Sequence, residues 1–298
     1  MKPHTPCIQC IVSVRLREII NSVRNQERSI KLQIQLLKIA YEEFSKNNEL
    51  TIIATNIFNR LIRLAPEIIE YYREIKRKAI DKAWENIGEY KSFLEKFMGY
   101  EKFRFATKIS IAGNALDTGV AGYEPPNKIS IDRILSTPLI IDHTREIYDY
   151  IRIGGKKILW LFDNAGESVL DTLLVEILQN YGNKVIGVAK EDPGFQNDLT
   201  ISDTYYARLD KVFDEIISTG YNGSSIHLNK VSEQFKKYLK EADLIVAKGM
   251  AHYEYISSIE LAKPIIHLLI PKCEPVAKTV GAIRGFYVAY LRKTGDHN

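Results

Sequence analysis

Residues 157–178, KILWLFDNAGESVLDTLLVEIL, constrain the fold more than any other stretch of this sequence. Residues 158–162 are an unbroken apolar run, which is typical of a strand covered on both faces. Gly166 permits a tight turn, and apolar residues then recur at helical spacing over 169–177. The segment therefore predicts a strand, a polar turn and a helix. Ligands of open parallel sheets bind beyond the carboxyl ends of the strands, so the turn is a candidate site.

Asp163 and Asn164, the polar pair in this turn, have two interpretations. Short polar side chains commonly cap a helix when they precede an apolar-periodic segment. Alternatively, a carboxylate and an amide oxygen, with Glu167 close by, provide hard ligands for a divalent cation. The turn alone leaves both interpretations open.

The composition is that of an ordinary globular protein and argues against several classes. The 298 residues suffice for one large domain or two smaller ones, and 45% of them are hydrophobic. The net charge is only +4, without a basic stripe interleaved with aromatic residues, so nucleic-acid binding is not favoured. Residues 1–29 have no apolar core preceded by positive charge, and no run approaches the ~20 apolar residues of a membrane span, so a cytoplasmic location is expected. Abundant Lys, Glu, Ile and Tyr are typical of a thermophile.

Residues 1–100 predict an all-helical domain, and residues 101–298 predict a separate α/β/α domain. Apolar residues repeat at helical spacing over 12–23 and 53–64, and Pro66 suits the first turn of a further helix. A third repeat, over residues 30–41, contributes another apolar face to the expected bundle: Ile30, Ile34, Leu37, Ile39 and Tyr41.

Cys7 and Cys10 form a C-x-x-C pair near the start of the chain, with His4 before them and Cys273 far away. A structural zinc site would need a full tetrahedral set of ligands, and a second paired knuckle is missing. Small buried thiols are therefore the favoured interpretation.

Residues 101–111 predict another helix, and the segment after it, SIAGNALDTG, places Asn114 and Asp117 three residues apart. Helical spacing would put both side chains on one face. Taken alone, this segment favours a helix end with polar caps over a binding site. Residues 141–151 predict a further helix before the strand at 158–162.

The second half of the chain alternates strands and helices, with strands expected at 184–189, 212–218, 243–247, 265–270 and 285–291. This alternation favours a mostly parallel sheet with helices on both faces. Thr200 and Asp203 have the spacing of a capping box, which predicts a helix after them. Polar residues follow several of the strands, at the edge where α/β active sites form: Asp163 with Asn164, Asp198 with Asp192, Ser218 with Gly220, and Lys248.

These residue types are suited to phosphoryl chemistry. Oxygen ligation by Asp163, Asn164 and Asp198 fits Mg²⁺ or Mn²⁺ better than structural zinc. Lys248 would add a point charge for a phosphate oxygen. A cation at this place would polarise a phosphoryl group and lower the pKa of an attacking water, so phosphate ester hydrolysis is the simplest reaction. The sequence has neither a Walker phosphate loop nor a dinucleotide fingerprint after a strand.

Four motifs in this order resemble the metal-dependent damage-control phosphatases, a family first catalogued as domain of unknown function 89. The resemblance covers nearly the whole chain and is closest to the stand-alone archaeal-type branch. It extends to the C-x-x-C start, to residues 113–117, and to Lys272-Cys273 with Val276-Ala277. The four motifs are Asp163-Asn-Ala-Gly-Glu167 with Asp171, Asn197-Asp198-x-Thr200 with Asp203, Ser218-Thr-Gly220, and Lys248-Gly249 with Glu254.

The resemblance implies a Rossmann-like three-layer α/β/α core with an added N-terminal helical domain. It implies that Asp163, Asn164 and Asp198 hold a divalent metal ion, such as Mn²⁺, Mg²⁺, Co²⁺ or Ni²⁺, and that Lys248 contacts phosphate. These four would be the catalytic residues, acting on sugar phosphates or other small phosphorylated metabolites. His252 departs from the asparagine of many members, which puts substrate contacts there in doubt. The residues expected to bind substrate are Asn114, Asp117, Glu167, Ser218, Gly220, Lys248, His252 and Glu254.

Two rival functions come from other classes. One is a non-catalytic ligand-binding module on a Rossmann-like scaffold, which would have no reason to gather Asp198 and Lys248 around Asp163 and Asn164. The other is a carboxyl methyltransferase, which predicts a glycine-rich loop after an early strand, whereas residues 163–167 contain only Gly166. The physiological substrate, the preferred metal and the oligomeric state stay open.

Overall fold

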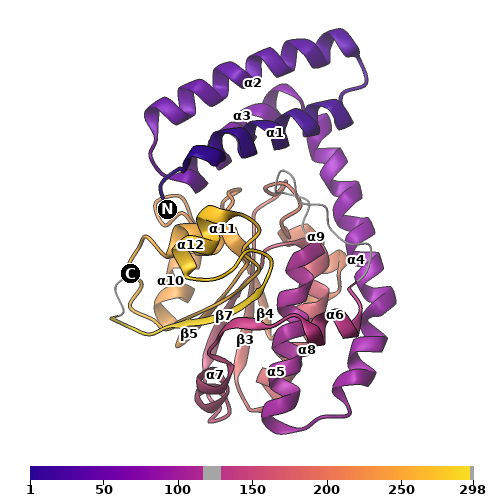
Figure 1. Ribbon diagram of the computed structural model, residues 1–298, viewed down its shortest axis with the longest axis vertical. Helices are drawn as coiled ribbons and strands as arrows, with labels where there is room; N and C mark the ends of the chain where they lie inside the picture. Colours follow the sequence, from indigo (N-terminus) through magenta and orange to yellow (C-terminus); the bar gives the residue numbers. More distant parts are fainter. Residues whose placement is uncertain (117–128, 296–298) are drawn as a thin grey trace.

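The computed structural model describes residues 1–116 and 129–295, which form helices around one seven-stranded sheet (Figure 1). The helices are α1 (Thr5–Ser22), α2 (Gln26–Lys46), α3 (Leu50–Leu64), α4 (Glu67–Leu94), α5 (Gly99–Gly113), α6 (Ile131–Ser136), α7 (Thr144–Ile151), α8 (Ala165–Asn180), α9 (Ile201–Tyr206), α10 (Glu233–Glu241), α11 (Gly249–Ile256) and α12 (Glu274–Val280), with short 3₁₀ turns at Asn114–Leu116 and Leu209–Lys211. The strands are β1 (Leu139–Asp142), β2 (Lys157–Leu161), β3 (Lys184–Ala189), β4 (Glu215–Ser218), β5 (Leu244–Lys248), β6 (Ile265–Leu269) and β7 (Tyr287–Arg292).

The sheet has the strand order β1-β7-β6-β5-β2-β3-β4. The five strands from β6 to β4 are parallel to their neighbours, while β7 pairs antiparallel with β6 and parallel with β1. The central position of β2 explains its unbroken apolar sequence, because neighbours and helices cover it on every side. The carboxyl end of β2 therefore lies in the middle of one sheet edge.

Helices cover both faces of the sheet, as the alternation of elements predicts. On β2, Ile158 and Trp160 pack into a core formed with α4, α5 and α8. Leu159 and Leu161 point to the opposite face and pack into a second core with Phe235 of α10 and with α11. The prediction of a three-layer α/β/α fold with a mostly parallel sheet is confirmed.

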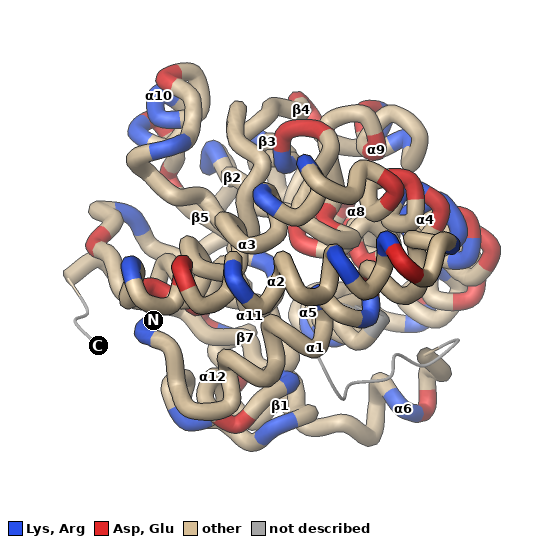
Figure 2. The backbone as a smooth tube through the Cα atoms, turned by 90° about the horizontal axis from the view of Figure 1, so that it is seen from above, with Lys and Arg blue, Asp and Glu red and all other residues tan. Residues whose placement is uncertain are grey.

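Helices α1, α2 and α3 form a layer of their own beyond one edge of the sheet (Figure 1). Seen from above, they lie over the middle of the molecule, and residues of both charges alternate along α4 beside them (Figure 2). Helix α4 joins this layer to the rest, because Ile68 and Tyr72 belong to the core of the helical layer and Ile80 and Tyr90 to the core under the sheet. The division of the chain near residue 100 stays a prediction.

Several expected elements differ from the structure. The apolar repeat on α2 does not face the core, because only Ile39 of the five is buried, whereas Ile30, Ile34, Leu37 and Tyr41 are at least half exposed. The outer side of α2 faces away from α1 and α3, which explains this exposure (Figure 1).

Strand β1 was not predicted. Strand β4 is shorter than the strand expected at 212–218, because residues 212–214 form a turn and the strand begins only at Glu215. The helix expected at 141–151 begins only at Thr144, because β1 occupies the residues before it. In the described part of the chain, every helix is either too short or too polar to cross a membrane.

Candidate active site at the carboxyl edge of the sheet

Asp163 and Asn164 follow the end of β2 and lead into α8. Asn164 is the N-cap residue of α8, but its side chain makes no capping hydrogen bond. The Nδ2 group of Asn164 instead donates to Asp163 Oδ2 at 3.1 Å and to Glu167 Oε2 at 3.2 Å. Asn164 therefore occupies the N-cap position without capping α8 through its side chain, and the side-chain contacts of this turn need another explanation.

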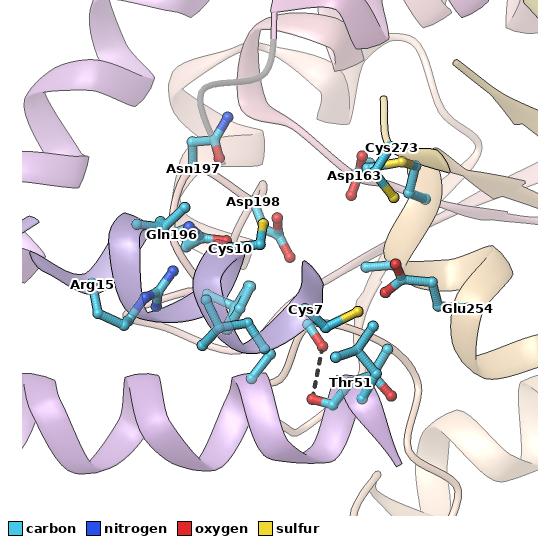
Figure 3. Close-up of a pocket in the computed structure, with 18 of the residues that line it drawn as sticks. Cys7, Cys10, Arg15, Thr51, Asp163, Gln196, Asn197, Asp198, Glu254 and Cys273 are labelled. Atoms are coloured by element: carbon cyan, nitrogen blue, oxygen red, sulfur yellow. Dashed lines mark hydrogen bonds between the residues drawn. The ribbon is translucent and has the colours of Figure 1, made fainter. Parts of the chain in front are cut away.

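The loop that carries Asp198 lies directly against this turn. Backbone hydrogen bonds join Leu199 N to Asp163 O at 2.8 Å and Ala165 N to Asn197 O at 3.0 Å. The Asn197 side chain donates to Asn164 Oδ1 at 2.8 Å. Asp163, Asn164 and Asp198, which the sequence predicts to act together, therefore line one cavity (Figure 3).

Asn114 reaches the same turn from the end of α5. Its Nδ2 group donates to Asp163 Oδ2 at 2.9 Å and to Glu167 Oε2 at 3.0 Å. Two amide groups thus hold the Asp163 and Glu167 carboxylates side by side. Asp117, the other residue expected from this segment, lies outside the described residues.

The backbone of Gly249 comes within contact distance of the Asp163 carboxylate. Gly249 has φ of +75°, and a Cβ at this position would lie 1.8 Å from Asp163 Oδ2. Only glycine combines this backbone conformation with such a close approach. The absence of a side chain at Gly249 therefore leaves the space that the Asp163 carboxylate occupies.

Lys248 lies beneath the site and does not line the cavity. Its fully buried ammonium group contacts Glu167 Oε1 at 2.9 Å, Asp171 Oδ1 at 2.6 Å, and the Oγ and O atoms of Ser110 at 2.6 and 2.8 Å. An ammonium group has three donors, so protein oxygens occupy all of them. A phosphate group would have to displace one of these oxygens, and the expected contact between Lys248 and phosphate stays a prediction.

Lys190, which follows β3, is a cation of the site that the sequence analysis missed. Its side chain is buried, its Nζ lies 3.8 Å from Asp198 Oδ2, and Nζ makes no hydrogen bond within residues 1–116 and 129–295. Burial lowers the pKa of Lys190, and the charges of Asp198 and Asp163 oppose this shift. The only sequence signal was its place at a strand end, which it shares with many solvent-exposed lysines.

The cavity measures about 160 Å³ and lies between the helical layer and the sheet edge. Asp163, Asn164 and Asp198 line the side of the cavity at the sheet edge, which we call its floor. Glu254 of α11 also lines the cavity (Figure 3). The helical layer contributes residues of α1 and α3 to the opposite wall: Cys7, Cys10, Ile11, Val14, Arg15, Leu50, Thr51 and Ala54.

Of the residues expected to bind substrate that the structure describes, only Glu254 lines the cavity. Asn114, Glu167 and Lys248 belong to the buried polar network next to Asp163, and Ser218, Gly220 and His252 lie elsewhere. The Ser218 hydroxyl group donates to Glu191 Oε2 at 2.6 Å and accepts from Gly220 N at 2.8 Å, and neither Ser218 nor Gly220 lines the cavity. His252 is buried, with Nε2 3.1 Å from Phe162 O and Nδ1 3.1 Å from Ser225 Oγ. His252 thus contacts the residue before Asp163 and has no surface toward the cavity.

The three cysteines, Cys7, Cys10 and Cys273, line the cavity. Burial raises the pKa of the Cys7 thiol and raises that of Cys273 to about 12. Within the described ranges, no three His, Cys, Asp or Glu side chains come together in a way that could hold a metal ion. Cys7 is buried, whereas Cys10 and Cys273 are partly exposed, so the interpretation as small buried thiols fits Cys7 only.

Asp163, Asn164 and Asp198 nevertheless fit a hard divalent cation by the chemistry of their donors. Two carboxylates and one amide oxygen are the ligands that Mg²⁺ and Mn²⁺ prefer, and such ions keep waters in their remaining positions. An amide oxygen has two lone pairs, so Asn164 Oδ1 can accept from Asn197 and still bind a cation.

Comparison with known proteins decides the family. The sequence model of the damage-control phosphatase ARMT1-like domain matches residues 4–287. The chain belongs to this family. The resemblance found in the motifs is therefore confirmed.

Relatives in this phosphatase family match over most of their lengths. A damage-control phosphatase from Archaeoglobus fulgidus is 35% identical over 256 residues, which is 85% of this chain and 86% of that protein. A damage-control phosphatase from Pyrococcus horikoshii is 27% identical over 297 residues, or 98% of this chain and 99% of that one. The crystal structure of a DUF89 family protein from Pyrococcus horikoshii matches with a TM-score of 0.81 and 27% identity, over 98% of this chain and 100% of that chain.

In this member of the family, Lys248→Met is expected to destabilise the fold by about 3–5 kcal/mol, because it leaves two buried carboxylates without their cation. The double variant Lys248→Met with Asp171→Asn should recover part of this loss. Urea denaturation of both variants measures the effect. A single variant as stable as the unmodified protein would contradict the structural role of Lys248.

Glu254 predicts a pH dependence of stability. Burial raises the pKa of Glu254 from 4.5 to about 7, against the opposing charge of the N-terminal ammonium group. The folded protein therefore binds this proton more tightly than the unfolded chain, and the contribution of Glu254 to stability falls as pH rises from about 4.5 to 7.

Glu254→Gln should leave stability nearly unchanged below pH 4.5 and raise it by about 1–3 kcal/mol above pH 7. Urea denaturation of both proteins across this range checks the sign. A difference between them that does not vary with pH would show that Glu254 does not titrate in this way.

Proposed function

We propose that this protein is a metal-dependent phosphatase that hydrolyses phosphate monoesters of small metabolites, such as sugar phosphates, and acts in metabolite damage control. The observation that carries the proposal is the convergence of Asp163, Asn164 and Asp198 on the floor of one cavity of small-molecule size. Two archaeal relatives are named as damage-control phosphatases, which supports the same activity.

Asp163, Asn164 and Asp198 would hold the cation through oxygen atoms. When bound, a divalent cation neutralises charge on phosphoryl oxygens and lowers the pKa of a coordinated water. Asn114 and Asn164 orient the Asp163 carboxylate through the hydrogen bonds to Oδ2. Pre-ordered ligands of this kind need little rearrangement during the reaction.

Lys190 balances the negative charge of the site from beneath. Its ammonium group lies 3.8 Å from Asp198 Oδ2 and holds no hydrogen bond to a residue in the described part of the chain. The carboxylates of Asp163 and Asp198 therefore have a positive charge nearby even when no metal ion is bound. The helical layer forms the opposite wall of the cavity.

A panel of phosphate esters, assayed for inorganic phosphate release with metal-stripped protein, tests the proposal. Adding back Mg²⁺, Mn²⁺, Co²⁺ or Ni²⁺ should restore hydrolysis of small esters. Release that is the same with and without metal would exclude the metal-dependent mechanism. Ligand binding without release under any of these conditions would favour the non-catalytic module.

A further inference from the structure

Arg15 of α1 is a buried cation in the wall of the cavity. Its side chain is only 4% exposed, and Nη2 pairs with Glu18 Oε1 at 3.0 Å. The other donor atoms, Nε and Nη1, are buried and make no hydrogen bond to any residue that the structure describes. In Figure 3 the guanidinium group points toward Gln196, beside Asn197 and Asp198.

The surroundings of Arg15 fix the orientation of its guanidinium group. The group lies 4.8 Å from the ring centroid of Phe58 and 5.5 Å from that of Phe195, so aromatic rings support it. Glu18, which holds Nη2, also accepts hydrogen bonds from Tyr72 and from Gln196. The free donors are thus held in place at the cavity and cannot swing out to solvent.

Unused N–H groups of a buried guanidinium are costly, because hydration has been lost and no protein acceptor replaces it. The planar guanidinium is also the side chain best matched to the oxygens of a phosphate or carboxylate group. Among the described residues that line the cavity, Arg15 contributes a positive charge to the wall, and the floor contributes carboxylates. A bound anion would therefore be attracted to Arg15.

We propose that Arg15 binds an oxyanion of the substrate in this cavity through Nε and Nη1. This inference rests on the proposed function in one respect, namely that the anion belongs to a phosphate ester. The oxyanion is either the phosphoryl group itself or a second acidic group of the same molecule. In both cases the helical layer supplies a substrate-binding residue, and the site is incomplete without α1.

The test uses the full-length protein and inorganic phosphate as the probe, titrated by calorimetry in the absence and presence of Mn²⁺. Arg15→Met with Glu18→Gln removes the cation without leaving a buried carboxylate unpaired, and Arg15→Lys keeps the charge but loses the planar fork. Arg24→Met is the matched control, because Arg24 is exposed after α1 and lies outside the cavity. Thermal unfolding identifies any variant that fails to fold, in which case Arg15→Lys carries the test.

If Arg15 binds the phosphoryl group, phosphate binding should be weakened roughly ten- to hundredfold in both Arg15 variants and unchanged in Arg24→Met. The second arm compares KM for 3-phosphoglycerate with KM for glycerol 3-phosphate. A rise confined to the carboxylate-bearing ester, with phosphate binding intact, assigns Arg15 to a second acidic group.

Unchanged phosphate affinity together with unchanged KM for both esters would overturn the inference and leave Nε and Nη1 of Arg15 to water. Phosphate binding is measured without turnover, so a protein that binds phosphate through Arg15 but hydrolyses nothing would refute the proposed function alone.

Discussion

Asp163→Asn is expected to abolish hydrolysis of phosphate esters and to weaken Mn²⁺ binding by more than about 100-fold, because the change removes a charged ligand from the site. Asparagine has the size of aspartate, so the change removes charge and little else. The fold should therefore persist, with thermal unfolding close to that of the unmodified protein. Inorganic phosphate release and calorimetric titration with Mn²⁺ measure the two losses.

The matched control for this variant is Asp192→Asn. Asp192 lies in the loop after β3 that also carries Asp198, but it is exposed and accepts a hydrogen bond from Ser202 at 2.6 Å. Activity and Mn²⁺ affinity should be unchanged in this control. Equal losses in both variants, or full activity in Asp163→Asn, would show that the ligand assignment is wrong.

Gly249→Ala should be nearly as damaging as removal of the Asp163 carboxylate. The new Cβ would lie 1.8 Å from Asp163 Oδ2, which is far inside van der Waals contact, so the carboxylate must move. A displaced carboxylate cannot share a cation with Asn164 and Asp198. Alanine at φ of +75° also costs about 1–2 kcal/mol of backbone strain. Steady-state kinetics with Mn²⁺ should show loss of kcat.

Gly281→Ala separates the steric effect of Gly249→Ala from backbone strain. Gly281 has φ of +74°, nearly the same conformation, but a Cβ there meets no atom within 4 Å. The control should therefore lose similar stability and keep its activity. A Gly249→Ala protein that retains activity would mean that the position of the Asp163 carboxylate is not important for the reaction.

Local sequence patterns predicted the secondary structure correctly where a segment's own residues determine its structure. The β2–α8 unit follows from the apolar run, the polar turn and the helical repeat, and Thr200 and Asp203 form the capping box that their spacing predicts. Strand β1 has only four residues and exists because β7 pairs with it from far along the chain. Apolar residues recur at helical spacing on two sides of α2, so the spacing alone could not show which side is buried.

The residues of the site were likewise predictable from sequence only in part. The proximity of Asp163, Asn164 and Asp198 could be predicted from the sequence, because each residue follows a strand of the same sheet. The burial of Lys248 could not, because it depends on Ser110 and Asp171 from two other helices. Arg15 of the helical layer was also missed, since its only signal was the opposite charge of Glu18 three positions later on α1.

The most direct test of the metal site is an anomalous difference map from a crystal soaked in Mn²⁺ and inorganic phosphate. We predict one strong peak at about 2.0–2.3 Å from oxygen atoms of Asp163, Asn164 and Asp198, with phosphate density beside it in the cavity. A peak at the cysteine thiols of the cavity wall, or no peak at the floor of the cavity at saturating Mn²⁺, would contradict the account.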